Sequence, residues 1–119
     1  MSVADKLQIR PTHRVCVLHL PDDIDLELPD DVPTTSDPAA ATAVLVFATD
    51  RRELSERAGP VVDAARRDAL AWIAYPKARQ LGTDLTRDNL SAALGAEDIR
   101  PVRQVAIDQT WSGLRFRPA

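Results

Sequence analysis

The stretch "TAVLVFATDRREL", Thr42 to Leu54, decides the fold that this sequence predicts. After Thr42 the residues up to Ala48 are all apolar, as expected for a strand that is covered on both faces. Asp50 follows directly, and its carboxylate can cap a helix while Glu53, the third helical residue, reaches back. The stretch therefore predicts a buried strand that leads straight into a helix.

The same pattern returns further along the chain. Gly59-Pro60 interrupts the first helix and predicts a kink or two abutting helices. A second apolar strand follows over Ala69 to Tyr75, and the next helix should be capped by Thr86 and ended by Gly95. One face of the first helix is apolar, formed by Leu54, Ala58, Val61, Val62 and Ala65.

The N-terminal third contains a single clear strand. Ala4 to Ile9 predicts a short amphipathic turn or helix, and "RVCVLHL", Arg14 to Leu20, predicts a strand that Pro21 ends. Asp22 to Pro38 holds three prolines and seven acidic residues without periodicity. We expect a loop there, with room for one short edge strand.

Two further strands, Val102 to Asp108 and Gly113 to Pro118, flank the short connection Gln109 to Ser112, which predicts an antiparallel hairpin. Strands that alternate with helices indicate a mostly parallel sheet with right-handed crossovers. We therefore expect one domain over residues 1–119, a small Rossmann-like three-layer α/β fold. Its sheet should be closed by the C-terminal antiparallel hairpin, an ending like that of class I methyltransferases.

Composition narrows the possible partners and the compartment. The net charge of −3 gives no general attraction for nucleic acid, and the single cysteine, Cys16, cannot form an internal disulfide. Met1 to Arg10 is polar and lacks a signal-peptide pattern. The longest apolar run, Ala39 to Ala48 with Thr42 inside it, is far shorter than the ~20 residues of a membrane span. We expect a cytoplasmic protein that binds neither nucleic acid nor a membrane.

The residues after the first strand argue against a cofactor. Dinucleotide and S-adenosylmethionine domains need glycines there, whereas this chain has "HLPDDID", His19 to Asp25, with two adjacent carboxylates. His13 and His19 lack a third ligand at metal spacing, and Cys16 lies within a strand as a small buried residue. The pairs Asp22-Asp23 and Asp30-Asp31 are interpreted as solvated. We predict no cofactor, no metal and no catalytic set.

Lys77 is the one conspicuous candidate for a ligand site. The chain has thirteen arginines but only two lysines, and Lys77 follows a strand within "YPKARQLGTDLT", Tyr75 to Thr86. Ligands of open α/β sheets bind beyond the carboxyl ends of the strands. The ammonium could bind a carboxylate or phosphate, or it could form a salt bridge with Asp50 or Asp84 that joins two loops. Trp111 could close the end of the sheet or form a pocket wall.

Three motifs, "AWIAYPK", "TDLT" and "AIDQTWSGLRF", resemble a family of small, uncharacterised bacterial proteins catalogued as a domain of unknown function. The opening "KLQIRPTHRVCVLHLPDD" resembles that family more loosely, and Asp22 to Ala41 departs from it. The resemblance implies a Rossmann-like fold without an established activity. It singles out Lys77, Thr83, Asp84, Asp108, Thr110, Trp111 and Ser112.

Two functional hypotheses follow, and neither assigns a catalytic residue. The first is a non-catalytic module, in regulation for example, that binds a protein partner or small ligand. The second is an enzyme or small-anion-binding domain with a pocket around Lys77, Asp84, Asp108 and Trp111. The final hairpin also exposes an edge, with Arg115 and Arg117 between apolar residues, from which we expect a monomer or weak homodimer. The predicted ligand-binding residues are Lys77, Thr83, Asp84, Asp108, Trp111 and Ser112.

Overall fold

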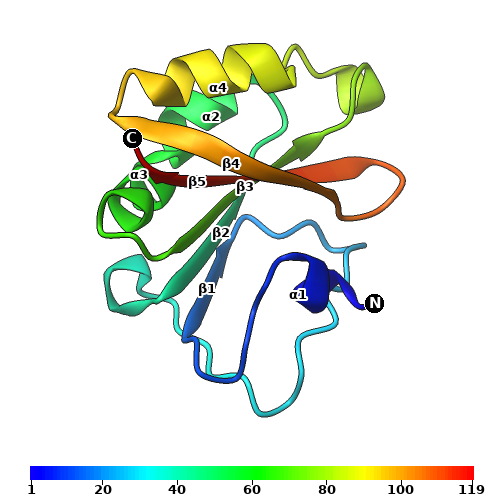
Figure 1. Ribbon diagram of the computed structural model, residues 1–119. Coiled ribbons are helices and arrows are strands. Elements are labelled where there is room, and N and C mark those ends of the chain that lie inside the picture. Colours follow the sequence, from blue (N-terminus) through cyan, green and yellow to red (C-terminus); the bar gives the residue numbers. More distant parts are fainter.

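A five-stranded mixed sheet forms the centre of the computed structural model, which describes all 119 residues (Figure 1). The strands lie in the order β1-β2-β3-β5-β4. β1, β2 and β3 pair in parallel, and β5 is antiparallel to both of its neighbours. The strand bounds are Val15–Leu18 for β1, Ala43–Phe47 for β2, Leu70–Pro76 for β3, Ile99–Ala106 for β4 and Trp111–Pro118 for β5.

The prediction of a mostly parallel, three-layer Rossmann-like domain is wrong. Two of the four strand pairings are antiparallel, because β5 inserts between β3 and β4. The chain between β1 and β2 also contains no α-helix, only the 3-10 turn η1, Pro38–Ala40. Prolines remove backbone donors and fix φ, so this proline-rich segment cannot supply the helix that a second helical layer needs.

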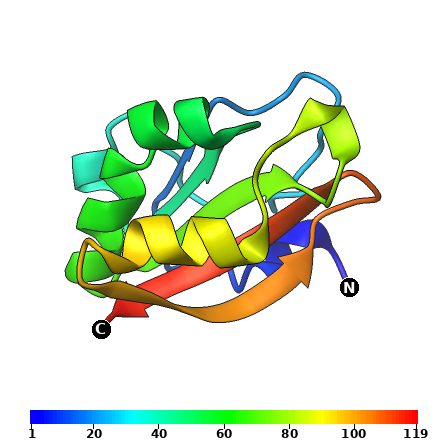
Figure 2. The same cartoon turned by 90° about the horizontal axis from the view of Figure 1, so that it is seen from above.

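Three helices cover one face of the sheet, here called the helix-covered face (Figures 1 and 2). They are α2, Arg51–Arg57, α3, Gly59–Arg66, and α4, Arg87–Gly95. The break at Gly59-Pro60 produces two abutting helices, with the proline in the first turn of α3, where its missing N–H costs no hydrogen bond. Side chains from all three helices pack on the central strands in a cluster of 20 buried residues.

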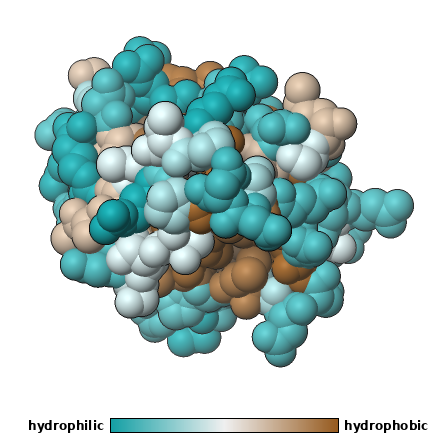
Figure 3. Space-filling model, turned by 90° about the horizontal axis from the view of Figure 1, so that it is seen from below, coloured by the Kyte–Doolittle hydropathy of each residue, from teal (hydrophilic) through white to brown (hydrophobic).

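The opposite face, here called the loop-covered face, carries α1, Val3–Lys6, and the segment between β1 and β2 (Figure 1). Its core holds Trp72 and Phe47, on which Leu7 and Leu26 pack. The Trp72 indole donates a 2.9 Å hydrogen bond to the Leu7 carbonyl, so the N-terminal segment is fastened to β3. Viewed from below, this side of the molecule shows apolar side chains among hydrophilic ones (Figure 3).

The two edges of the sheet differ. Beside β1, the backbone around Thr34 adds a single parallel bridge to Val15. The free edge at the other side is β4, which carries Pro101 and a bulge before Arg103. Proline and bulges both discourage pairing with another chain. Arg115 lies on the inner strand β5, not on the edge that the sequence suggested. None of the helices has the length and apolar character needed to cross a membrane.

Candidate functional site

The loops that follow β3 and β4 meet at one end of the sheet (Figure 2). The backbone N–H of Lys77, directly after β3, donates a 2.7 Å hydrogen bond to the carbonyl of Thr110 in the β4–β5 turn. The chain then passes through the 3-10 turn η2, Gln80–Gly82, before α4 begins. Residues far apart in sequence are therefore brought together where the sequence placed a site.

The Asp108 side chain stabilises the β4–β5 turn. One of its carboxylate oxygens accepts hydrogen bonds from the backbone N–H groups of Thr110, at 2.8 Å, and Trp111, at 2.7 Å. An aspartate that bonds the backbone two and three residues ahead is a common way to fix a tight turn. Asp108 therefore holds the turn in place.

Asp84 and Thr83 are likewise used by the backbone around them. The Thr83 hydroxyl accepts a 3.0 Å hydrogen bond from the Leu85 N–H. The Asp84 carboxylate accepts a 2.8 Å bond from the N–H of Arg51, the first residue of α2. Asp84 thus binds the N-terminus of a helix distant in sequence. Lys77 belongs to none of the four ion pairs, so the alternative of a salt bridge to Asp50 or Asp84 is not formed.

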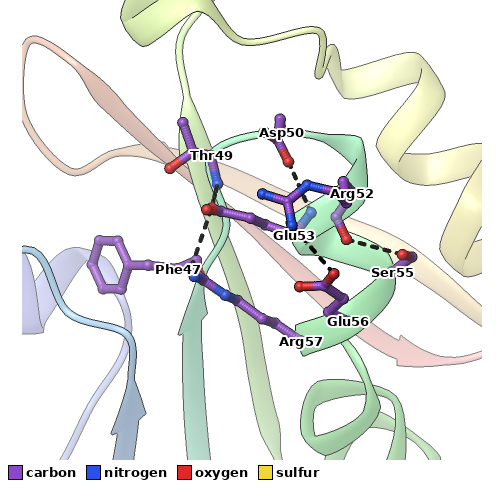
Figure 4. Close-up of polar contacts among 8 residues, drawn as sticks. All are labelled: Phe47, Thr49, Asp50, Arg52, Glu53, Ser55, Glu56 and Arg57. Atoms are coloured by element: carbon purple, nitrogen blue, oxygen red, sulfur yellow. Dashed lines mark hydrogen bonds and ion pairs between the residues drawn. The ribbon is translucent and has the colours of Figure 1, made fainter.

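The start of α2 is held by a second set of polar contacts (Figure 4). Asp50 caps the helix by accepting a 2.8 Å bond from the Glu53 N–H. Glu53 reaches back as expected, but to the N–H of Thr49, at 2.8 Å, and it pairs with Arg57 at 3.2 Å. Arg57 also donates to the Phe47 carbonyl at 3.1 Å. The two carboxylates at the carboxyl end of β2 are therefore occupied.

The sheet separates two of the predicted site residues. Neighbouring residues of a strand point to opposite faces, so Trp111 and Ser112 diverge. Trp111 packs on the loop-covered face, with its ring edge-on to Phe47 at a centroid distance of 5.2 Å. Ser112 is the strand partner of Tyr75, which belongs to the helix-covered core. The single pocket expected around Lys77, Asp84, Asp108 and Trp111 is therefore not formed.

Lys77 and Ser112 instead line a cleft on the helix-covered face, here called the Lys77 cleft. Its volume is about 480 Å³, and it lies between the end of β3, the start of α4 and the outer strand β4. The lining residues are Tyr75, Lys77, Ala78, Leu85, Thr86, Arg87, Gln104, Val105, Ala106 and Ser112.

Positive charge dominates the Lys77 cleft. Lys77 and Arg87 both line it, neither belongs to an ion pair, and no lining residue is acidic. Burial raises the pKa of the Tyr75 phenol, against a smaller lowering by the Arg87 charge, so the phenol stays protonated at neutral pH. Ser112 is only 5% exposed and lines the cleft. The cleft thus combines two cations with three hydroxyl groups, those of Tyr75, Thr86 and Ser112.

Sequence reasoning missed several residues of the cleft. Arg87 is the first residue of the helix whose cap, Thr86, was predicted, so its place beside Lys77 could have been inferred. Tyr75 ends the predicted strand, so its place near Lys77 at the carboxyl end of β3 could also have been inferred. Gln104 had no such signal, because the register of β4 depends on a bulge between Pro101 and Arg103.

The hydrogen bond from the Arg51 N–H to Asp84 caps α2 from a distant part of the chain, and it supports a stability prediction. Replacing Asp84 with alanine should lower the free energy of unfolding by about 1 kcal/mol, the usual cost of losing a helix cap, because the Arg51 N–H loses its acceptor. Urea unfolding of Asp84→Ala and Asp84→Asn measures this. The asparagine variant keeps an acceptor oxygen and should lose less than half as much. Equal losses in the two variants would show that the hydrogen bond is not the cause.

Comparisons with known proteins give no match. No protein-family model matches this sequence, and no curated protein or solved structure matches it significantly. The family resemblance suggested by the three motifs stays a prediction.

Proposed function

We propose that this chain is a non-catalytic module that binds a small anion, a phosphate or carboxylate compound, in the Lys77 cleft. The observation that supports this most is the pairing of two cations, Lys77 and Arg87, in a cleft without a carboxylate. The whole chain has a net charge of −3, so this concentration of positive charge is local.

The ammonium and guanidinium groups suit an oxyanion. A lysine binds an anion as a compact point charge, while an arginine presents a planar fork that fits carboxylate or phosphate oxygens. The Ser112 hydroxyl belongs to a residue that lines the cleft, and it can donate to the same anion. The N-terminus of α4 adjoins the cleft and adds a partial positive charge. A volume of about 480 Å³ falls within the range of small-molecule sites.

Binding without turnover is the better proposal because the cleft offers little to a reaction. General acid–base catalysis needs a group that gains and loses a proton near neutral pH, most often histidine or a carboxylate. The lining holds neither, and the raised pKa of Tyr75 keeps its proton in place. Binding of an anion that reports a metabolic state would fit a regulatory role.

A thermal-shift screen with phosphorylated sugars, nucleotides and small carboxylates, at constant ionic strength, tests the proposal. A ligand at a hundred times its dissociation constant stabilises the fold by about 2.7 kcal/mol, which is easily detected. The shift should disappear in Lys77→Ala and weaken in Ser112→Ala. Without ligand, the free energy of unfolding of Lys77→Ala should lie within about 0.5 kcal/mol of the wild-type value, because the ammonium forms no ion pair.

Arg79→Gln is the matched control, since Arg79 is an exposed cation in the same loop that does not line the cleft. It should keep the full ligand shift. If no compound stabilises the protein, or if Arg79→Gln loses the shift as fully as Lys77→Ala, the cleft does not bind anions as proposed.

A further inference from the structure

The Lys77 cleft lies near Tyr75, at one end of β3. A second basic cleft lies at the other end of this strand, near Leu70. We call it the Arg115 cleft. Its volume is about 610 Å³, and its cations come from three separate parts of the chain: the segment before β1, the end of α3 and strand β5. The lining residues are Gln8, Arg10, His13, Ala41, Thr42, Arg67, Asp68, Ala69, Leu70 and Arg115.

Arg115 is a partly desolvated cation whose hydrogen bonds are incomplete. One terminal nitrogen donates a 2.8 Å bond to the Gln8 side chain, but the buried Nε–H has no acceptor. Burial lowers the pKa of Arg115, and the neighbouring charges of Arg117 and Arg103 add to this lowering, against the opposite effect of Asp68. The Nε–H is closed to solvent, so an anion in the cleft would bind the guanidinium through its terminal nitrogens, as a partly desolvated cation that attracts an opposite charge strongly.

The one acidic residue in the lining does not neutralise this cleft. Both carboxylate oxygens of Asp68 accept hydrogen bonds from Arg117, each at 3.0 Å. That fork-to-carboxylate pair is the strongest geometry available to the two groups. Asp68 is thus engaged by Arg117, which does not line the cleft, and the charges of Arg10, Arg67 and Arg115 exceed the single negative charge.

Arg67 and His13 are fixed in place. The Arg67 guanidinium donates to the carbonyls of Pro38, at 2.9 Å, and Ala41, at 2.8 Å. Nδ1 of His13 accepts a 2.9 Å bond from the Arg10 N–H, which leaves Nε2 to carry the proton as a donor. Burial, Arg10 and Arg115 lower the pKa of His13, so the ring is neutral at pH 7. Fixed donors bind an anion with little loss of conformational freedom.

From this arrangement we infer that the Arg115 cleft binds a small polyanion carrying two or more phosphate or carboxylate groups. Three arginines and a neutral histidine can face several charged oxygens at once, whereas the Lys77 cleft offers two cations. The inference is independent of the proposed function, because the two clefts share no lining residue.

Isothermal titration with pyrophosphate and with citrate, at constant ionic strength, tests the inference and separates phosphate from carboxylate ligands. Arg10→Gln is the main variant. The Arg10 side chain makes no hydrogen bond or ion pair within the protein, so the substitution removes no contact that stabilises the fold. We expect saturable binding of at least one probe, weakened about tenfold or more in Arg10→Gln, as for loss of one charge-assisted hydrogen bond. Arg115→Lys, which keeps the charge but loses the fork, should weaken binding as well.

Two controls make the result specific. Arg100→Gln removes one exposed positive charge on β4, outside the cleft, and should leave the affinity unchanged. Lys77→Ala removes any binding of the same probe in the Lys77 cleft but should leave the affinity of the Arg10-dependent site unchanged, which distinguishes the two clefts. The inference is overturned if neither probe binds, if Arg100→Gln weakens binding as much as Arg10→Gln does, or if Lys77→Ala alone abolishes it.

Discussion

Replacing Trp72 with alanine should lower the free energy of unfolding by about 4 kcal/mol, the largest effect that we expect from any single change. Trp72 is 1% exposed on the central strand β3, and its ring fills the loop-covered core. Its indole also donates the 2.9 Å hydrogen bond to the Leu7 carbonyl. Alanine would leave a large cavity and a buried carbonyl without a donor. Urea unfolding followed by far-UV circular dichroism measures the loss.

A matched pair of conservative variants isolates the hydrogen bond. Trp72→Phe and Trp111→Phe make the same change in the same core, but only Trp72 donates an indole bond within the protein. Trp72→Phe should therefore cost more, by about 1–3 kcal/mol, the penalty for an unsatisfied buried group. If the two variants unfold at the same urea concentration, the bond to Leu7 does not fasten the N-terminal segment. That segment carries Gln8, Arg10 and His13 into the Arg115 cleft.

Gly113→Ala should lower the free energy of unfolding by about 1–3 kcal/mol, the range for overpacking a well-filled core. A Cβ at position 113 would lie 3.3 Å from a Trp72 ring carbon and 3.4 Å from a Leu7 methyl carbon. The Trp72 ring cannot move aside, because it is buried and held by its hydrogen bond to Leu7. Thermal and urea unfolding of the variant would measure the effect.

The control for this substitution is Gly95→Ala, at the end of α4, where an added Cβ has nothing within 4 Å. It should leave stability unchanged or raise it by up to about 1 kcal/mol, since alanine favours the helix. Combining Gly113→Ala with Trp72→Phe should cost less than the sum of the two single changes, because the smaller ring leaves room. Strict additivity would show that Trp72 is not the obstacle.

Local elements of this fold could be predicted because local chemistry determines them. Asp50 and Thr86 cap α2 and α4 as expected, since a short polar side chain before an apolar helical face leaves little alternative. The break at Gly59-Pro60 does yield two helices. These features depend on residues within one or two turns of each other.

The arrangement of strands could not be predicted in the same way. Whether a closing hairpin adds its strands at the edge or inserts one beside β3 depends on pairing between residues about 40 positions apart, such as Tyr75 and Ser112. Alternating apolar patterns fit both arrangements. The proline-rich segment Asp22 to Pro38 argues against a second helical layer, while the alternation of strands and helices in the rest of the chain favours one.

The candidate site was predicted only in part. Lys77 and Ser112 do line one cleft, while Asp84, Asp108 and Thr83 hold the backbone and Trp111 lies across the sheet. The motifs alone cannot reveal which of these residues line a cleft and which hold the backbone. That depends on which face each residue of β5 points to and on which carboxylates accept hydrogen bonds from the backbone. The cleft contains Arg87 and lacks the predicted Asp84 and Asp108, so its charge is positive and not mixed as expected.

The most direct test of the anion-binding proposal is a titration of inorganic phosphate into the ¹⁵N-labelled protein, at constant ionic strength, followed by amide NMR shifts. We expect saturable shifts centred on Lys77, Arg87 and Ser112 that vanish in Lys77→Ala. Shifts that rise linearly over the whole surface, or that saturate only at residues away from this cleft, would contradict the proposal.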